Sequence, residues 1–280
     1  MNIDVAIKQL LGTRQTWLEM PPELAELLPL AIEAFRDMIS RIPEDHLVPQ
    51  AGREFSRCQW HVKTGPAPTE DPDDGIFVKD ESVPDRYPTT HGRRPDNKLT
   101  LQVRRRTRRL FKYRYKTEPD GFRPETHVFF DLAERIMDLR DAWIEAIITA
   151  LVKQNPALKG ISHRRDLTTL RFMIYRRVSA DCPGVAGQYH VDKNDITIHM
   201  ADSCPGLLVR QDTGEYRLIP TRPGWAYIFT SKRFKALCGL EPLLHGAQDN
   251  GARAVCVSFV HFWHPGQRLQ FYQEHPHSSE

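Results

Sequence analysis

The chain has 280 residues, which is long enough to bury a full core in one domain or in one domain with a sizeable extension. Its formal net charge of +3 is small for this length and does not by itself indicate a nucleic-acid-binding protein. The five cysteines form no CxxC pair, which favours reduced thiols in a cytoplasmic protein, and no apolar run approaches a signal sequence or the roughly 20 residues of a membrane span.

The first 40 residues contain one well-marked helical stretch. Residues 1–20 fit either a short helix or a leading strand. From Pro22, apolar residues recur at helical spacing as far as Ile39, and Glu23 lies in the first turn, where the helix dipole favours an acid. Pro29 lies within this pattern and leaves open whether the stretch forms one helix or two.

Residues 43–100 show little regular pattern. Proline and aspartate dominate residues 66–96, which contain the turn cluster Asp71-Pro72-Asp73-Asp74-Gly75. A long irregular stretch in a compact chain is usually functional or disordered, so a role at a binding site and the lack of any chemical role both stay open.

The most basic segment is residues 104–116. Its second half alternates Phe111, Tyr113 and Tyr115 with Lys112, Arg114 and Lys116. This pattern predicts a strand with one aromatic and one basic face. Such a strand could be a solvated rim, contact an anionic small molecule or bind single-stranded nucleic acid.

The clearest helix lies within residues 126–155. Leu132, Ile136 and Leu139 keep one apolar face, and Asn155-Pro156 ends the pattern. The helix is amphipathic and long enough to pack across the outside of a sheet. We assign it no chemical role.

Short strands and turns follow from about residue 187 to residue 262. The run 196–200 alternates apolar and polar side chains, Asp212-Thr213-Gly214 predicts a hairpin, and Pro223-Gly224 precedes another strand over 225–229. The even spacing of these turns predicts a compact meander of strands.

Within this meander, His190-Val191-Asp192 places two metal-ligating side chains on one face of an extended segment. His245 comes 55 positions after His190, and Arg253 follows it by eight. Two imidazoles and one carboxylate on one side of a metal are the ligand set of non-heme iron(II) oxygenases. His199 is the alternative third ligand, but its odd separation from Asp192 would turn it to the opposite face of a continuous strand.

The ordered set of motifs resembles the 2-oxoglutarate-dependent iron(II) dioxygenases, in particular the isopenicillin N synthase-like branch. The resemblance covers about residues 170–263. It is carried by Leu170 to Tyr175, Tyr189-His190-Val191-Asp192, Gly206 to Asp212, Pro223-Gly224-Trp225-Ala226, His245 and Arg253. It implies an α+β fold with a double-stranded β-helix (jelly-roll) core and flanking helices.

The resemblance also implies a division of the chain, taken as a single oxygenase domain over residues 1–280. Residues 1–125 would form an N-terminal extension with lid-like loops, and residues 126–155 a buttressing helix. Residues 160–265 would form the jelly-roll core with the iron site, followed by a polar tail over 266–280.

The roles that the resemblance implies are specific. His190, Asp192 and His245 would bind Fe(II), while Arg253 and Tyr175 would bind 2-oxoglutarate; O2 is the other reactant. Three positions depart from the family pattern: Val255 replaces a common Ser, Gly246 a common Arg, and Met173 the Asn of the upstream strand. Val255 lacks the hydroxyl of that Ser, and Tyr175 is the candidate substitute donor.

The predicted function is therefore an Fe(II)- and 2-oxoglutarate-dependent dioxygenase. It would hydroxylate, desaturate or cyclise an unactivated C–H of a small molecule of specialised metabolism, which could be anionic, and release succinate and CO2. The presence of Asp192 favours oxygenation over halogenation, because halogenating relatives lack this carboxylate. The alternatives are an iron oxidase that needs no 2-oxoglutarate and a jelly-roll binding module that uses residues 104–116. We expect no nucleic-acid or membrane partner, and the substrate and oligomeric state stay open.

Overall fold

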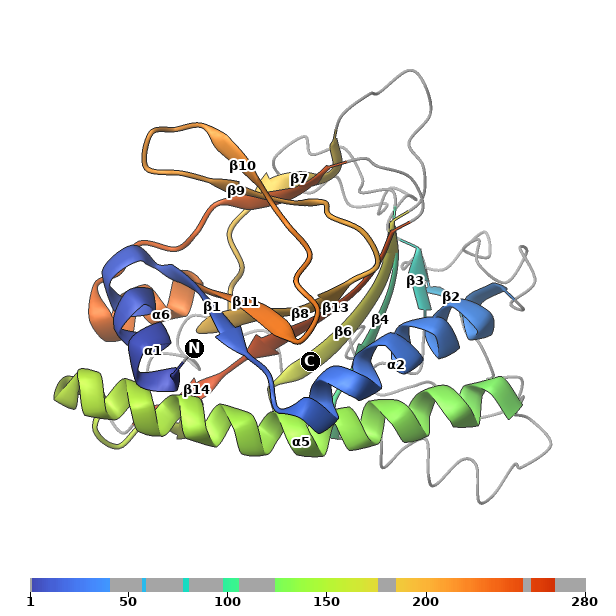
Figure 1. Cartoon of the computed structure of the whole chain (residues 1–280), viewed down its shortest axis with the longest axis horizontal. Helices are drawn as coiled ribbons and strands as arrows, with labels where there is room; N and C mark the ends of the chain where they lie inside the picture. Colours follow the sequence, from blue (N-terminus) through green and yellow to red (C-terminus); the bar gives the residue numbers. More distant parts are fainter. Residues whose placement is uncertain are drawn as a thin grey trace, which may run out of the picture.

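The computed structural model describes residues 2–40, 57–58, 78–80, 98–105, 124–175, 185–248 and 253–264. Two antiparallel sheets face each other, and the long helices lie against the outer side of the larger sheet (Figure 1). The helices are α1 (Ile3–Thr13), α2 (Pro22–Ser40), α5 (Pro124–Gln154), the 3-10 helix η2 (Pro156–Leu158) and α6 (Lys232–Cys238).

The strands are β1 (Gln15–Glu19), β2 (Arg57–Cys58), β3 (Val78–Asp80), β4 (Lys98–Val103), β5 (Ser162–His163), β6 (Thr169–Tyr175), β7 (Val185–His190), β8 (Ile196–Asp202), β9 (Leu207–Arg210), β10 (Tyr216–Ile219), β11 (Trp225–Thr230), β12 (His245–Gln248), β13 (Arg253–Val260) and β14 (Phe262–Trp263). The larger sheet has the order β1-β11-β8-β13-β6-β4-β3-β2, and the smaller sheet has the order β10-β9-β12-β7. From β6 to β13 the chain passes repeatedly between the two sheets. This is the topology of a double-stranded β-helix, and the predicted fold class is confirmed.

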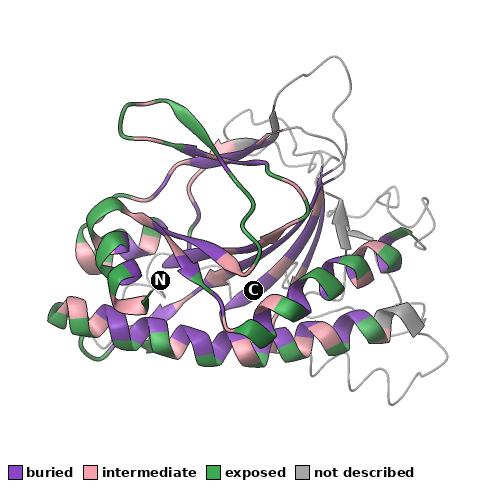
Figure 2. Ribbon diagram, viewed as in Figure 1, coloured by how far each residue is buried: buried purple, intermediate pink, exposed green. Residues whose placement is uncertain are grey.

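Two layers of side chains extend from the larger sheet. On β6, Leu170 and Phe172 point toward the helices, where Phe172 packs against Phe35 of α2 and Phe129 of α5. The alternate residues of β6 point between the two sheets, as the period of a strand requires. Figure 2 shows the buried faces of α2 and α5 turned toward the sheet. The helices therefore close one face of the larger sheet and leave the other for the space between the sheets.

The open questions at the N-terminus are settled by the structure. The helix alternative is right for the start of the chain, since Ile3, Val5 and Ile7 all lie in α1; β1 follows it and forms the edge of the larger sheet. Helix α2 continues through Pro29, so the two-helix alternative is wrong. Proline removes one helical hydrogen bond, but the apolar face of α2 is buried on both sides of it, from Leu24 to Ile39, and this packing favours a continuous helix.

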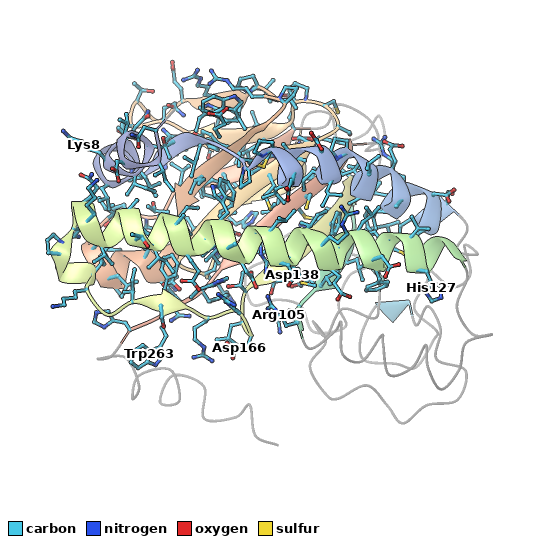
Figure 3. All side chains as sticks on the ribbon, turned by 60° about the horizontal axis from the view of Figure 1, so that its bottom comes forward. Lys8, Arg105, His127, Asp138, Asp166 and Trp263 are labelled. Carbon is cyan, nitrogen blue, oxygen red and sulfur yellow. The ribbon has the colours of Figure 1, made fainter. Side chains whose placement is uncertain are left out.

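The predicted basic strand lies largely outside the described residues, as do most of the residues predicted to form lid-like loops and all of the predicted polar tail. Two of its arginines are described. Arg104 Nε donates to Thr169 Oγ1 at 2.8 Å. Arg105 donates to Asp141 and Asp138 of α5, and Figure 3 shows Arg105 beside Asp138. Both arginines thus have partners within the fold.

Among the described residues, none of the helices is both long and apolar enough to cross a membrane.

Candidate active site

His190 and His245 come from neighbouring strands of the smaller sheet. His190 ends β7 and pairs in register with His245, which begins β12, so their ring centroids lie 4.4 Å apart. Asp192 lies just beyond β7, with one carboxylate oxygen 3.4 Å from His190 Nε2 and the other 3.4 Å from His245 Nε2. The structure thus brings together the three residues that were predicted from the sequence to be metal ligands.

The geometry of these three residues fits a metal ion. Their donor atoms all lie within 4.8 Å of one another. Neighbouring ligands around an ion held at about 2.1 Å would be roughly 3 Å apart, close to the observed 3.4 Å contacts. A set of two imidazoles and one carboxylate on one side of an ion suits iron(II) and leaves the other side open.

Hydrogen bonds hold two of the donors in place. Thr197 Oγ1 donates to Asp192 Oδ2 at 2.7 Å, and the Ser231 hydroxyl lies 2.9 Å from Thr197 Oγ1. His245 Nδ1 lies 3.2 Å from the carbonyl oxygen of Leu243, which leaves Nε2 to face the site. Thr197 and Ser231 were not predicted from the sequence, because an alternating strand and a helix start give no sign that their side chains lie near a carboxylate.

The protonation states suit metal binding. Burial lowers the pKa of His245 to about 4, despite the opposing effect of Asp192, so its imidazole is neutral at neutral pH. Burial raises the pKa of Asp192, but His245, His190 and Thr197 together hold it well below its usual range. A neutral imidazole and an ionised carboxylate are the forms that bind a metal.

The three donors line a cavity between the two sheets. Arg253 and Tyr175 line the same cavity, together with Val255 and Val257 from the inner face of β13. Every residue predicted from the sequence to bind iron or 2-oxoglutarate therefore lines this cavity.

Arg253 is almost fully buried, with 2% of its surface exposed. Its Nε lies 3.0 Å from Asp202 Oδ1, and its guanidinium carbon lies 4.7 Å from the ring centroid of Tyr175. Its Nη1 has no hydrogen-bond partner in the described part of the chain. Gly206 lies so close that a Cβ there would overlap the guanidinium, so this position accepts only glycine without displacing Arg253.

Tyr175 makes a different contact from the one expected. Its ring faces the guanidinium of Arg253, and its hydroxyl lies 4.0 Å from the sulfur of Met173. In this structure the ring of Tyr175 supports Arg253, and a direct bond from its hydroxyl to a ligand stays a prediction.

His199 also lines this cavity, so the expectation that it faces away from Asp192 is wrong. Residues 191–195 form no strand and the chain bends at 193–195, before β8 begins at Ile196. His199 and Thr197 therefore share the inner face of β8. His199 Nε2 lies 3.1 Å from Asp202 Oδ2, and His199 is outside the group of three donors.

Comparison with known proteins supports the fold. No protein-family profile matches the sequence, and no curated protein matches it. Among solved structures, a full-length Neurospora crassa protein in complex with alpha-KG has a TM-score of 0.67 and 14% identity, covering 94% of this chain and 79% of that one. A protein of the 2OG-Fe(II) oxygenase family from Caulobacter crescentus has a TM-score of 0.62 and 13% identity, covering 93% and 83%. The dioxygenase for auxin oxidation from rice has a TM-score of 0.60 and 14% identity, covering 92% and 76%.

These likenesses establish the fold of the chain. It is the double-stranded β-helix of the 2-oxoglutarate- and iron(II)-dependent oxygenases. What the site does in this protein rests on its own residues.

Proposed function

We propose that this protein is an Fe(II)- and 2-oxoglutarate-dependent dioxygenase that oxidises a C–H bond of a small molecule. One observation carries the proposal: two imidazoles and a carboxylate meet in a cavity that also holds a buried arginine, Arg253. This combination supplies both an iron site and a cation for a dicarboxylate co-substrate.

Each residue has a definite task in this proposal. His190, Asp192 and His245 would hold iron(II) from one side and leave its other side facing the cavity. When bound, iron and 2-oxoglutarate together activate O2 for C–H oxidation and release succinate and CO2. Arg253 would pair the far carboxylate of 2-oxoglutarate, and Tyr175 would hold Arg253 in position through its ring.

The neighbours favour a small-molecule substrate. The Neurospora crassa protein is also described in complex with alpha-KG and thymine, and the rice protein is a dioxygenase for auxin oxidation. Hydroxylation, desaturation and cyclisation are all compatible with this site, and a role in specialised metabolism belongs to the proposal. The free thiols of Cys204, Cys238 and Cys256 support a cytoplasmic location.

The direct test is succinate release from 2-oxoglutarate in the presence of Fe(II) and ascorbate. The wild-type protein should release succinate even without its substrate, at a slow uncoupled rate. Replacing His190, Asp192 or His245 by Ala should abolish the release. A fully active, iron-loaded His245→Ala variant would refute the ligand set, and His199→Ala should then be tested in its place.

An iron oxidase that needs no 2-oxoglutarate is the second candidate. Two observations favour it: Val255 offers no hydroxyl to a carboxylate, and Asp202 already pairs with Arg253. Oxygen uptake that is independent of 2-oxoglutarate would identify this function.

The binding-module alternative has less support, because Arg104 and Arg105 are engaged within the fold. It predicts tight, salt-sensitive binding of single-stranded nucleic acid, whereas the dioxygenase proposal predicts none.

A further inference from the structure

Arg171 lies in the same cavity as the proposed iron ligands, but the dioxygenase chemistry assigns it no role. It lies on β6 between Leu170 and Phe172, which point toward the helices. Its own side chain therefore points between the two sheets, on the same face of the strand as Met173 and Tyr175. A charged side chain in this position is costly to desolvate and calls for an explanation.

The guanidinium of Arg171 has no carboxylate partner among the residues that the structure describes. It lies over the ring of Phe259, with its carbon 4.4 Å from the ring centroid, and its buried Nε makes no hydrogen bond within that part of the chain. Other buried or partly buried arginines do form ion pairs: Arg253 meets Asp202, and Arg140 meets Asp141. Stacking on an aromatic ring holds the guanidinium in one plane and leaves its hydrogen-bonding edges available to a ligand.

The sheet register places Arg171 at a distance from the metal site that a metabolite-sized molecule can span. Arg171 pairs with Val257 of β13, and Val257 pairs with His199 of β8. Phe259, over which the guanidinium lies, pairs with Thr197, the residue that donates to Asp192. β6 and β8 are two strand spacings apart, roughly 10 Å. A metabolite-sized molecule could therefore bind Arg171 at one end and present a carbon to the metal site at the other.

We propose that Arg171 binds a carboxylate group of the substrate, so that the substrate is a small organic acid. This inference rests on the proposed dioxygenase function and adds the substrate class. A carboxylate matches the flat guanidinium edge with two parallel hydrogen bonds. Lys98, which is buried and lines the same cavity, adds positive charge beside Tyr175. Arg253 would take the co-substrate and Arg171 the substrate.

The test uses the full-length protein with cobalt(II) in place of iron and the 2-oxoglutarate analogue N-oxalylglycine bound. Benzoate and its uncharged counterpart benzamide serve as probes, with phenyl phosphate as a third. Paramagnetic cobalt relaxes the NMR signals of a probe bound near it, so the readout needs no turnover. We expect the wild type to bind benzoate at least tenfold more tightly than benzamide, with clear relaxation of the ring protons.

Arg171→Met removes the charge and keeps a side chain of similar length. It should lower benzoate affinity roughly tenfold or more, as expected for losing a charged hydrogen bond, and leave benzamide unchanged. Cobalt and N-oxalylglycine should bind this variant as they bind the wild type. Arg36→Met, at a surface pair with Glu33 on α2, is the matched control and should change neither probe.

Three results would overturn the inference, and they are distinguishable. If cobalt and N-oxalylglycine bind the wild type but benzoate gains nothing over benzamide, the organic-acid substrate is wrong and the proposed function stands. If Arg171→Met weakens N-oxalylglycine tenfold or phenyl phosphate is the tighter probe, Arg171 has another ligand. If neither cobalt nor N-oxalylglycine binds the wild type, the proposed function itself fails.

Discussion

The carboxylate of Asp202 lies between Arg253 and His199, with Oδ1 3.0 Å from Arg253 Nε and Oδ2 3.1 Å from His199 Nε2. All three side chains are largely shielded from solvent. The charge of Arg253 is therefore already offset before any co-substrate arrives. A second carboxylate that pairs with Arg253 must approach the negative charge of Asp202.

This arrangement predicts that Asp202→Asn strengthens co-substrate binding. The Asn side-chain oxygen can still lie against Arg253 Nε, while the repulsion of a nearby carboxylate disappears. Removing like-charge repulsion of about 1 kcal/mol or more corresponds to roughly fivefold tighter binding or better. Titration of the nickel-loaded protein with N-oxalylglycine measures the effect. Weaker binding in this variant would instead mean that Asp202 is needed in charged form to hold Arg253.

Replacing Arg253 by Ala should have the opposite effect. The far carboxylate of 2-oxoglutarate would lose its partner in a shielded cavity, at a cost on the order of 2–5 kcal/mol. The apparent affinity for 2-oxoglutarate should therefore fall by roughly 30-fold or more. Arg253→Lys should recover only part of the affinity, because an ammonium group cannot reproduce the guanidinium fork.

Two further measurements define the role of Arg253. Metal affinity should be unchanged in Arg253→Ala, since this residue is not a ligand. Tyr175→Phe keeps the ring against Arg253 and should weaken 2-oxoglutarate by about tenfold at most. An unchanged 2-oxoglutarate dependence of succinate release in Arg253→Ala would remove Arg253 from the co-substrate site.

The strands and the closeness of His190 to Asp192 were predictable from local patterns, whereas the fold and the grouping with His245 were predicted from the family resemblance. The alternation of apolar and polar side chains predicts the strands. Because side chains two positions apart point to the same face of a strand, His190 and Asp192 were expected to lie close together. The pairing of β7 with β12 then supplies His245. The family resemblance provided the order in which these strands meet.

The partners of these residues were not predictable in the same way. Thr197 lines the cavity and Asp202 lies beside Arg253 because of how β8 pairs with β13, and local sequence does not specify this register. The pairing of β13 with β8 also shifts in register between Cys256 and Val257, which a regular antiparallel pair would not do. The bend after Asp192 reverses the expected direction of His199, because side chains alternate regularly only within a continuous strand.

The hydrogen bond from Thr197 to Asp192 leads to a prediction for metal affinity. Thr197→Val keeps the shape of the side chain and removes the donor at 2.7 Å. Loss of a hydrogen bond that orients a ligand typically lowers metal affinity by about 10- to 100-fold. Thr230→Val, a buried threonine of β11 that bonds the carbonyl of Glu241, is the control and should leave metal affinity unchanged. Competition with a chromogenic chelator measures both variants, and equal affinities would contradict the role of Thr197.

The last prediction concerns acid stability and a buried histidine remote from the cavity. His163 of β5 lies 3.9 Å from Asp141 and 4.0 Å from Glu145, both on α5, and 2.9 Å from the Thr168 hydroxyl. Burial lowers its pKa to about 4; Asp141 opposes this shift, while Arg140, Arg165 and Arg105 add to it. The folded state thus disfavours the protonated imidazole, whereas the unfolded chain protonates it near pH 6.5.

The contribution of His163 to stability is therefore complete above pH 6.5 and is lost as the pH falls toward 4. The loss amounts to roughly 3 kcal/mol, since the pKa falls from 6.5 in the unfolded state to about 4 in the folded state. Gln at position 163 can keep the hydrogen bond to Thr168 and does not titrate. The free energy of unfolding of the His163→Gln variant should therefore fall less steeply than that of the wild type as the pH falls from 6.5 toward 4. His127→Gln, near the other end of α5 (Figure 3), should retain the wild-type slope. Denaturant unfolding at a series of pH values gives the slopes, and parallel curves for wild type and His163→Gln would show that His163 is not the group that titrates.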